Sequence, residues 1–125
     1  MRVKVYFNLR KKVFSIVSCQ GPDKGRVIEY AKDIFLKDCT FKVNAAGRAR
    51  VLESRQKNVH AYVYGTLCTH QEMLLREDLG ALPRVRYNPY ETETFVDLQG
   101  KPVVKSPQVF LTCQPEGPRI YAIES

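Results

Sequence analysis

Short segments with a two-residue side-chain period constrain this fold most strongly. Residues 3–7 and 13–17 have this period and consist largely of valine, isoleucine, phenylalanine and tyrosine, which strands favour. The polar stretch 8–12 lies between them, and stretch 20–25, which contains glycine and proline, follows. Because glycine and proline readily adopt the backbone angles of turns, the pattern predicts two strands joined by a hairpin connection and ended by a turn.

Residues 26–44 fit two kinds of element. Their β-formers predict one strand over 27–31 running toward Phe35 and another over 40–43, with a break near residues 37–38. Apolar residues within 26–36 also recur at the three- and four-residue spacing of an amphipathic helix. Strand is the preferred interpretation, and helix over 26–36 stays the alternative.

The rest of the chain adds more strands and one clear helix. Thr69 and Glu72 have the spacing of a capping box, and Gly80 suits a helix C-cap, so a helix is predicted around residues 69–79. About eight short strands with one helix indicate a mainly β (α+β) fold, as a small antiparallel β-barrel or sandwich. The later strands are predicted at residues 59–65, 85–87, 94–97, 103–105, 109–112 and 119–123.

Length and composition indicate one domain that stays in the cytoplasm. A chain of 125 residues that is 44% hydrophobic can bury one core, so residues 1–125 are expected to form a single domain. No apolar run has the length of a membrane span or of a secretory signal. The four cysteines are scattered singly, without a Cys-x-x-Cys pair, so we expect free thiols and neither a metal nor another cofactor.

A net charge of +7 favours a polyanion or an acidic protein as the partner. Cations concentrate over residues 48–57, and a strand over 59–65 follows, so a hairpin with a basic tip is predicted here. Arginine and lysine bind phosphates, and tyrosine rings stack on unpaired bases. The candidate nucleic-acid-binding residues are Arg48, Arg50, Arg55, Lys57, Asn58, His60, Tyr62 and Tyr64.

His60 also suggests chemistry. An imidazole can accept the proton of a ribose 2′-hydroxyl while the nearby Lys57 holds the phosphate. A metal-independent ribonuclease of this kind needs a second proton-transfer group, which His70 or a tyrosine would supply only if the fold brings it near. A structural hydrogen-bonding histidine is the preferred interpretation.

A second candidate segment surrounds Pro89. Its proline restricts the preceding residue to an extended conformation, so a rigid turn is the main interpretation. The aromatic and basic side chains around it offer a ligand-binding lip as the alternative. The residues of this possible lip are Arg84, Arg86, Tyr87 and Tyr90.

Residues 47–63 and 85–97, together with the N-terminal segment 5–15, resemble a family of small uncharacterised accessory proteins of tailed bacteriophages. The resemblance implies a phage origin and therefore a bacterial host cytoplasm. Small phage proteins of this type often act on host metabolism or defences, so by analogy a host protein becomes a plausible partner.

Three functions follow as expectations. The first is a phage-encoded accessory protein that binds DNA or RNA through a basic hairpin and performs no catalysis. The alternative is an inhibitor or adaptor that binds an acidic host protein, in host takeover or anti-defence. The third is a ribonuclease that uses His60.

Overall fold

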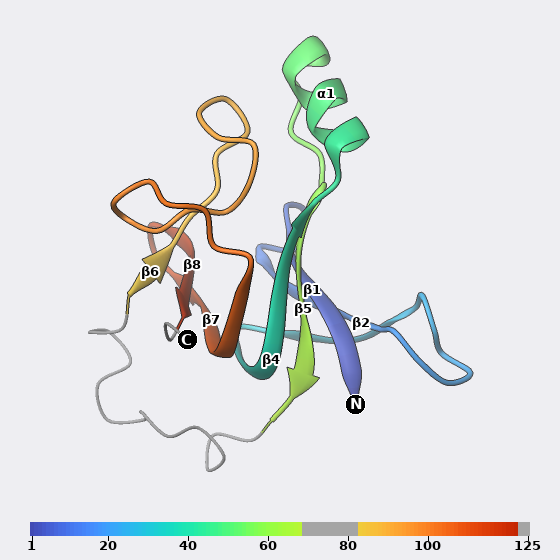
Figure 1. The fold of residues 1–125 in the computed structure, drawn as a ribbon. Coiled ribbons are helices and arrows are strands. Elements are labelled where there is room, and N and C mark those ends of the chain that lie inside the picture. Colours follow the sequence, from blue (N-terminus) through green and yellow to red (C-terminus); the bar gives the residue numbers. More distant parts are fainter. Residues whose placement is uncertain (69–82, 123–125) are drawn as a thin grey trace.

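A computed structural model describes residues 1–68 and 83–122 of the chain (Figure 1). These residues form one antiparallel sheet of 8 strands in the order β3-β2-β1-β5-β4-β7-β8-β6. A helix, α1, connects β4 to β5. The elements are β1 Arg2–Asn8, β2 Val13–Ser18, β3 Val27–Ala31, β4 Asp33–Val43, α1 Ala45–Ser54, β5 Ala61–Leu67, β6 Arg84–Val85, β7 Lys105–Gln114 and β8 Gly117–Ala122.

The mainly β, antiparallel fold is confirmed, but the sheet is not closed into a barrel. Its two edges are β3 and β6, and closure would require these strands to hydrogen-bond to each other. Strand β6 has only 2 residues and pairs with β8 alone, so it offers almost no ladder for a closing strand. The sheet therefore curls without closing.

The strand interpretation of residues 26–36 is confirmed, and the helix alternative is wrong. Strand β4 pairs with β5 on one side and β7 on the other, and these ladders override the helical spacing. The predicted break at residues 37–38 is an irregularity inside β4, where the register with β5 shifts and Asp38 has a φ of 51°. The real break falls at Lys32, between β3 and β4.

The strands predicted over 94–97 and 103–105 are not separate strands in the structure. Val96 makes only isolated bridges, to Arg86 and Pro102, while β7 runs unbroken from Lys105. A turn at Asp97, whose carboxylate accepts two backbone N–H groups, reverses the chain before a ladder can grow. The helix predicted over 69–79 lies outside the described residues.

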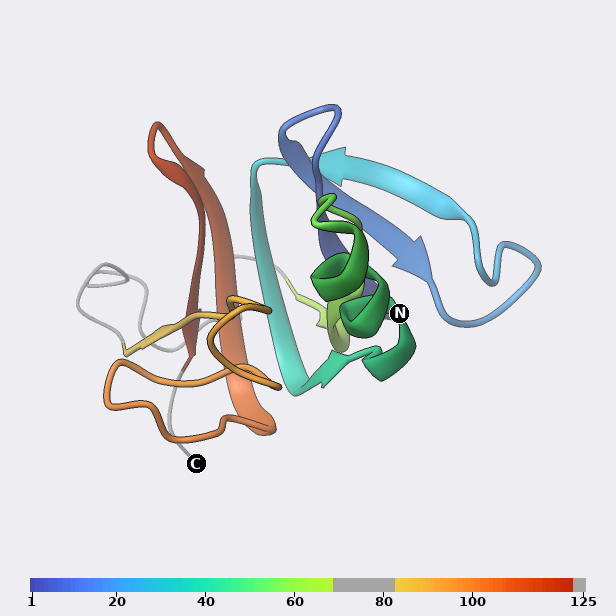
Figure 2. The same cartoon turned by 90° about the horizontal axis from the view of Figure 1, so that it is seen from above.

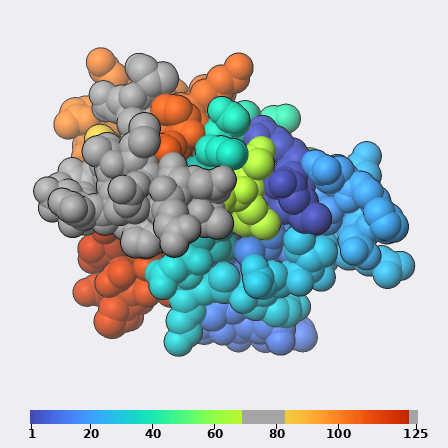
Figure 3. Space-filling model, turned by 90° about the horizontal axis from the view of Figure 1, so that it is seen from below, coloured from blue at the N-terminus to red at the C-terminus, as the bar shows by residue number. Residues whose placement is uncertain are grey.

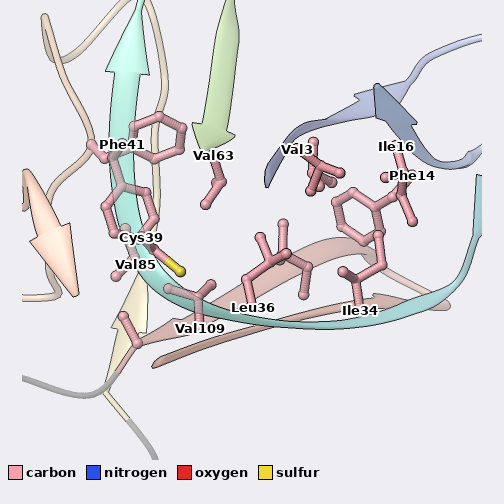
Figure 4. Packing of buried hydrophobic residues seen from close by; sticks show 14 residues of the cluster. Val3, Phe14, Ile16, Ile34, Leu36, Cys39, Phe41, Val63, Val85 and Val109 are labelled. Carbon is pink, nitrogen blue, oxygen red and sulfur yellow. The ribbon is translucent and has the colours of Figure 1, made fainter. Parts of the chain in front are cut away.

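The core fills the concave side of the curled sheet. Figure 4 shows Val3, Phe14, Ile34 and Leu36, from β1, β2 and β4, gathered in this space. Val3 and Leu36 are fully buried. This packing holds β1 and β4 in place around β5, their common neighbour in the sheet.

Helix α1 lies over one end of the sheet. Figures 1 and 2 show it beside the loops of residues 86–104, at the end where β4 leaves the sheet and β5 enters it. Within the described residues, no helix has both the length and the apolar character needed to cross a membrane.

Candidate nucleic-acid interface

The basic segment after residue 44 is a helix and not the predicted hairpin. The side chain of Asn44 caps its start by accepting a hydrogen bond of 2.9 Å from the Gly47 N–H. Arg55 ends it in the left-handed conformation, and its N–H donates to the carbonyl of Val51. The helix therefore forms its own backbone hydrogen bonds, and the two caps satisfy groups at its ends.

The helix packs tightly onto the chain just before β5. A Cβ atom at Gly47 would lie 2.6 Å from the Cβ of His60, a separation that real Cβ contacts essentially never show. Glycine is needed at this position because α1 and His60 approach so closely. Val51 is the other buried residue of the helix.

Arg48 links helix α1 to the loop of residues 87–92 through hydrogen bonds. Its Nε atom donates to the carbonyls of Pro89 and Thr92, at 3.2 and 3.1 Å. Its positive charge also lies near Tyr87 and favours ionisation of that phenol. Arg48 thus anchors α1 to residues 87–92, whereas Arg50, Arg55, Lys57 and Asn58 are exposed.

His60 is 6% exposed and uses both ring nitrogens. Its Nδ1 lies 2.7 Å from the carbonyl oxygen of Asn58, which only accepts, so Nδ1 carries the proton. In this tautomer the Nε2 atom accepts from the Tyr87 hydroxyl, also at 2.7 Å. Burial raises the pKa of Tyr87, and the nearby Arg48 opposes that rise. His60 therefore offers no free nitrogen as a general base.

Tyr62 and Tyr64 lie on the opposite side of β5 from the core residue Val63, as the alternation predicts. The ammonium of Lys4 is 5.0 Å from the centre of the Tyr62 ring, and that of Lys42 is 5.1 Å from the centre of the Tyr64 ring. Strand β1 adds a third ring to these two tyrosines, because Tyr6 packs edge-on against Tyr62 with the ring centres 5.8 Å apart. We name Tyr6, Tyr62, Tyr64, Lys4 and Lys42 the tyrosine platform.

Sequence reasoning missed three members of the platform. Lys4 and Tyr6 occupy the polar half of the alternation in β1, and Lys42 does so in β4. That alternation could have marked them as surface residues. Only the pairing of β1 and β4 on either side of β5 places them around Tyr62 and Tyr64.

A groove of about 790 Å³ opens at the α1 end of the sheet, and we name it the terminal groove. It brings together two segments that the sequence marked separately: Lys57, Asn58 and His60 on one side, Tyr87 and Tyr90 on the other. Tyr6 lines the groove too, so the groove and the tyrosine platform share a residue. Lys12, from the β1–β2 turn, adds a further exposed cation.

A smaller inner pocket of about 230 Å³ adjoins the groove. Its wall includes Arg84 and Arg86, the other two residues of the predicted lip, on and just after β6. The two spaces have five lining residues in common, Tyr6, Phe7, Ala61, Tyr87 and Pro118. The candidate lip thus extends from the groove into the interior of the sheet.

No disulfide joins Cys19, Cys39, Cys68 or Cys113 in the part of the chain that the structure describes. Burial raises the pKa of Cys39 to about 12. Within residues 1–68 and 83–122, no group of three or more His, Cys, Asp and Glu side chains is arranged to hold a metal ion.

Comparison with known proteins gives a phage relationship. No solved structure matches the chain. The Gene 82 protein of Mycobacterium phage L5 is 34% identical over 119 residues, which cover 90% of each chain. The family model described as Mycobacterium phage L5 gene 82 protein matches residues 1–116. The expected phage origin is thus confirmed, and the chain belongs to the family of the Mycobacterium phage L5 gene 82 protein.

Proposed function

We propose that this phage protein binds single-stranded nucleic acid, without catalysis, on the tyrosine platform and in the terminal groove. The observation that carries the proposal is the arrangement of two lysine ammonium groups beside two part-exposed tyrosine rings on one sheet face. Aromatic rings stack on unpaired bases and cations bind the phosphates, which is how many single-strand-binding sheets work. A net charge of +7 favours the same ligand.

The lysines do not prevent stacking, although they lie over the rings in the free protein. A cation–π contact at an exposed site stabilises by about 0.5–1 kcal/mol. Stacking of a base on an aromatic ring is worth about 1–3 kcal/mol. A base therefore displaces Lys4 or Lys42 from its ring, and the released ammonium is then free to pair with a phosphate.

The other cations have different roles in this proposal. Lys57 and Lys12 line the groove and contact phosphates there. Arg50 and Arg55 are exposed on α1 and at its end, so they raise the local positive potential. Arg48 positions the groove wall through its bonds to Pro89 and Thr92.

The ribonuclease hypothesis is not part of the proposal, because both ring nitrogens of His60 already have partners. A phage protein that binds nucleic acid in this way acts in the cytoplasm of the bacterial host. Single strands are favoured over duplexes because the faces of paired bases are covered by their neighbours in the stack.

The test is fluorescence anisotropy with labelled single-stranded DNA and RNA and with duplexes of the same sequence, at low and near-physiological salt. We expect single strands to bind more tightly than duplexes, and Tyr62→Ala and Tyr64→Ala to weaken binding by about 10-fold each. Tyr30→Ala is the matched control, since Tyr30 is an exposed tyrosine of β3, outside the platform. Equal binding by these three variants, or no binding by the wild type, would refute the proposal.

A second candidate, binding of a host protein, is favoured by strand β3. It is an edge of the sheet, and its Val27, Ile28 and Tyr30 are 38%, 38% and 48% exposed. Figure 3 shows the connection that leads into β3 projecting from the rest of the surface. An exposed apolar edge strand can pair with an extended segment of a partner.

The two candidates are separable by a pull-down from host lysate. Protein binding through β3 predicts a stoichiometric partner that is captured by the wild type and by Tyr62→Ala, and is lost with Ile28→Lys. Retention of the partner by Ile28→Lys would exclude β3 as its binding site.

A further inference from the structure

Strand β3 is a sheet edge that is open to a partner. Among the described strands, β2 alone pairs with β3, so one side of the β3 backbone faces away from the sheet (Figure 2). In an antiparallel pair, only every second residue directs its N–H and C=O groups at the neighbouring strand. The remaining backbone groups of β3 can therefore form a ladder with an added strand.

The side chains of β3 form an exposed apolar surface. Val27, Ile28 and Tyr30 are exposed large hydrophobic residues within one strand of 5 residues. The register of β3 with β2 shifts at Ile28, so Ile28 has no residue directly opposite it on β2. Apolar side chains of an added strand would cover this surface, and their burial would favour binding.

A cation lies at each end of β3. Arg26 comes directly before the strand and Lys32 directly after it, and both are exposed. They are six positions apart in the chain, which corresponds to about 20 Å of extended strand. Asp23 and Lys24, in the turn before Arg26, have opposite charges that offset each other. An added strand with an acidic residue at each end would thus place opposite charges across from Arg26 and Lys32.

A second copy of this chain fits the edge poorly. Two β3 strands that paired antiparallel about their midpoint would bring the two Glu29 carboxylates opposite each other and would set Arg26 against Lys32. Like charges directly opposite each other destabilise a pair of strands. The charge pattern of β3 therefore favours a different, acidic chain.

We infer that β3 binds an extended acidic segment of a host protein, in which apolar residues lie between two acidic residues that face Arg26 and Lys32. This inference rests on the second candidate function, binding of a host protein, and adds the chemistry of the bound segment. Backbone hydrogen bonds extend the sheet by one strand and supply affinity, while the two ion pairs select the partner.

The experiment is an NMR titration of the isotope-labelled protein with a short peptide of alternating valine and threonine that has glutamate at both ends. The matched peptide has lysine at both ends. We expect the acidic peptide to shift the amide signals of residues 27–31 and to bind about 10-fold more tightly than the basic one. A third peptide, with proline at the centre of the acidic sequence, cannot form a continuous ladder and should bind more weakly.

The double variant Arg26→Glu/Lys32→Glu is the matching change in the protein. We expect it to reverse the preference, so that the basic peptide binds more tightly than the acidic one. Arg50→Glu/Lys57→Glu is the control, because it changes the net charge equally at exposed residues outside β3, and it should keep the preference for the acidic peptide. Thermal unfolding of both variants checks that they remain folded.

The outcomes separate this inference from the second candidate. Absence of binding by the acidic peptide, or equal binding of the acidic and basic peptides, would overturn the acidic segment. Loss of the host partner with Ile28→Lys would still support β3 as a protein-binding edge in that case. An acidic preference that persists in folded Arg26→Glu/Lys32→Glu would overturn the role of these two cations. A dimer in sedimentation that Ile28→Lys disrupts would show that a second copy occupies the edge instead.

Discussion

The Tyr87 hydroxyl donates a hydrogen bond to Nε2 of His60 across 2.7 Å, joining residues that are 27 positions apart in the chain. In the sequence, His60 lies between α1 and β5, and Tyr87 comes just after β6. Arg48 of the helix donates to the carbonyls of Pro89 and Thr92, close to the same tyrosine in the chain. Three separate segments therefore meet around Tyr87, and His60 and Tyr87 form part of the wall of the terminal groove.

Removing the phenol oxygen should destabilise the protein. Tyr87→Phe leaves the buried Nε2 of His60 without a donor, so we expect the free energy of unfolding to fall by about 1–3 kcal/mol. Urea denaturation measures this change. Tyr90→Phe is the control, since Tyr90 is 52% exposed, and it should change the stability by less than about 0.5 kcal/mol. Equal effects of the two substitutions would contradict the assigned hydrogen bond.

Gly47→Ala tests the close packing of α1 on His60. Alanine is the better helix former by about 1 kcal/mol, so helix propensity alone predicts a more stable protein. The added Cβ would lie 2.6 Å from the Cβ of His60, however, and neither atom can move without its backbone. We expect overpacking to dominate and the unfolding free energy to fall by about 1–3 kcal/mol in urea denaturation.

The control for this prediction is a glycine introduced elsewhere in the same helix. Ala49 is exposed, so Ala49→Gly should cost only the propensity difference of about 1 kcal/mol. A Gly47→Ala protein that is more stable than the wild type would show that α1 does not pack on His60 as described.

Cys39 should be inert at neutral pH. Its pKa is raised to about 12 by burial, so almost none of the thiol is ionised, and the thiolate is the reactive form. We expect maleimide to modify Cys19 and Cys113, which are partly exposed, well before Cys39. Mass spectrometry after timed labelling gives the order, and labelling of Cys39 at the same rate as Cys19 in folded protein would contradict its burial.

Ionisation of Cys39 should lower the free energy of unfolding at high pH. The unfolded state ionises near the ordinary pKa of 9.0, while the folded state holds its proton up to about pH 12. The folded state therefore binds more protons between these values, and the contribution of Cys39 is full below pH 9 and falls as the pH rises toward 12. Cys39→Ala should flatten this part of a curve of unfolding free energy against pH.

The salt dependence of nucleic-acid binding should show whether Lys4 and Lys42 contact phosphates. Each phosphate contact on a single strand contributes about 0.7 to the slope of log affinity against log salt concentration. The combined variant Lys4→Ala/Lys42→Ala should therefore reduce that slope by about 0.7 for each lysine. Lys24→Ala, in the exposed turn before β3, is the control for the loss of charge alone. An unchanged slope in the double variant would remove these lysines from the interface.

Local signals in the sequence determined most of the strands. The alternation in residues 3–7 and 13–17 gave β1 and β2, because the two-residue period follows from the geometry of each strand itself. The concentration of cations over residues 48–57 predicts a hairpin tip, and the helix α1 that the structure forms there contradicts this prediction. Asn44 at the cap position is the local signal for the start of this helix.

Some residues of the candidate site can also be predicted from the sequence. Tyr62, Tyr64, Lys57 and Tyr87 follow from residue type and position, because aromatic and basic side chains on polar faces suit nucleic acid. Their grouping was not visible. The predicted neighbours Arg48 and His60 prove to be committed to hydrogen bonds inside the protein.

By itself, then, the sequence determined which segments extend and which of their side chains are polar, since both depend on residues close together in the chain. Only the tertiary structure decided that β1 and β4 flank β5, which surrounds Tyr62 with Tyr6 and Lys4, and that His60 meets Tyr87. The physical reason is that strand order depends on how all the apolar faces are buried together, and no local pattern specifies which strand becomes the neighbour of which.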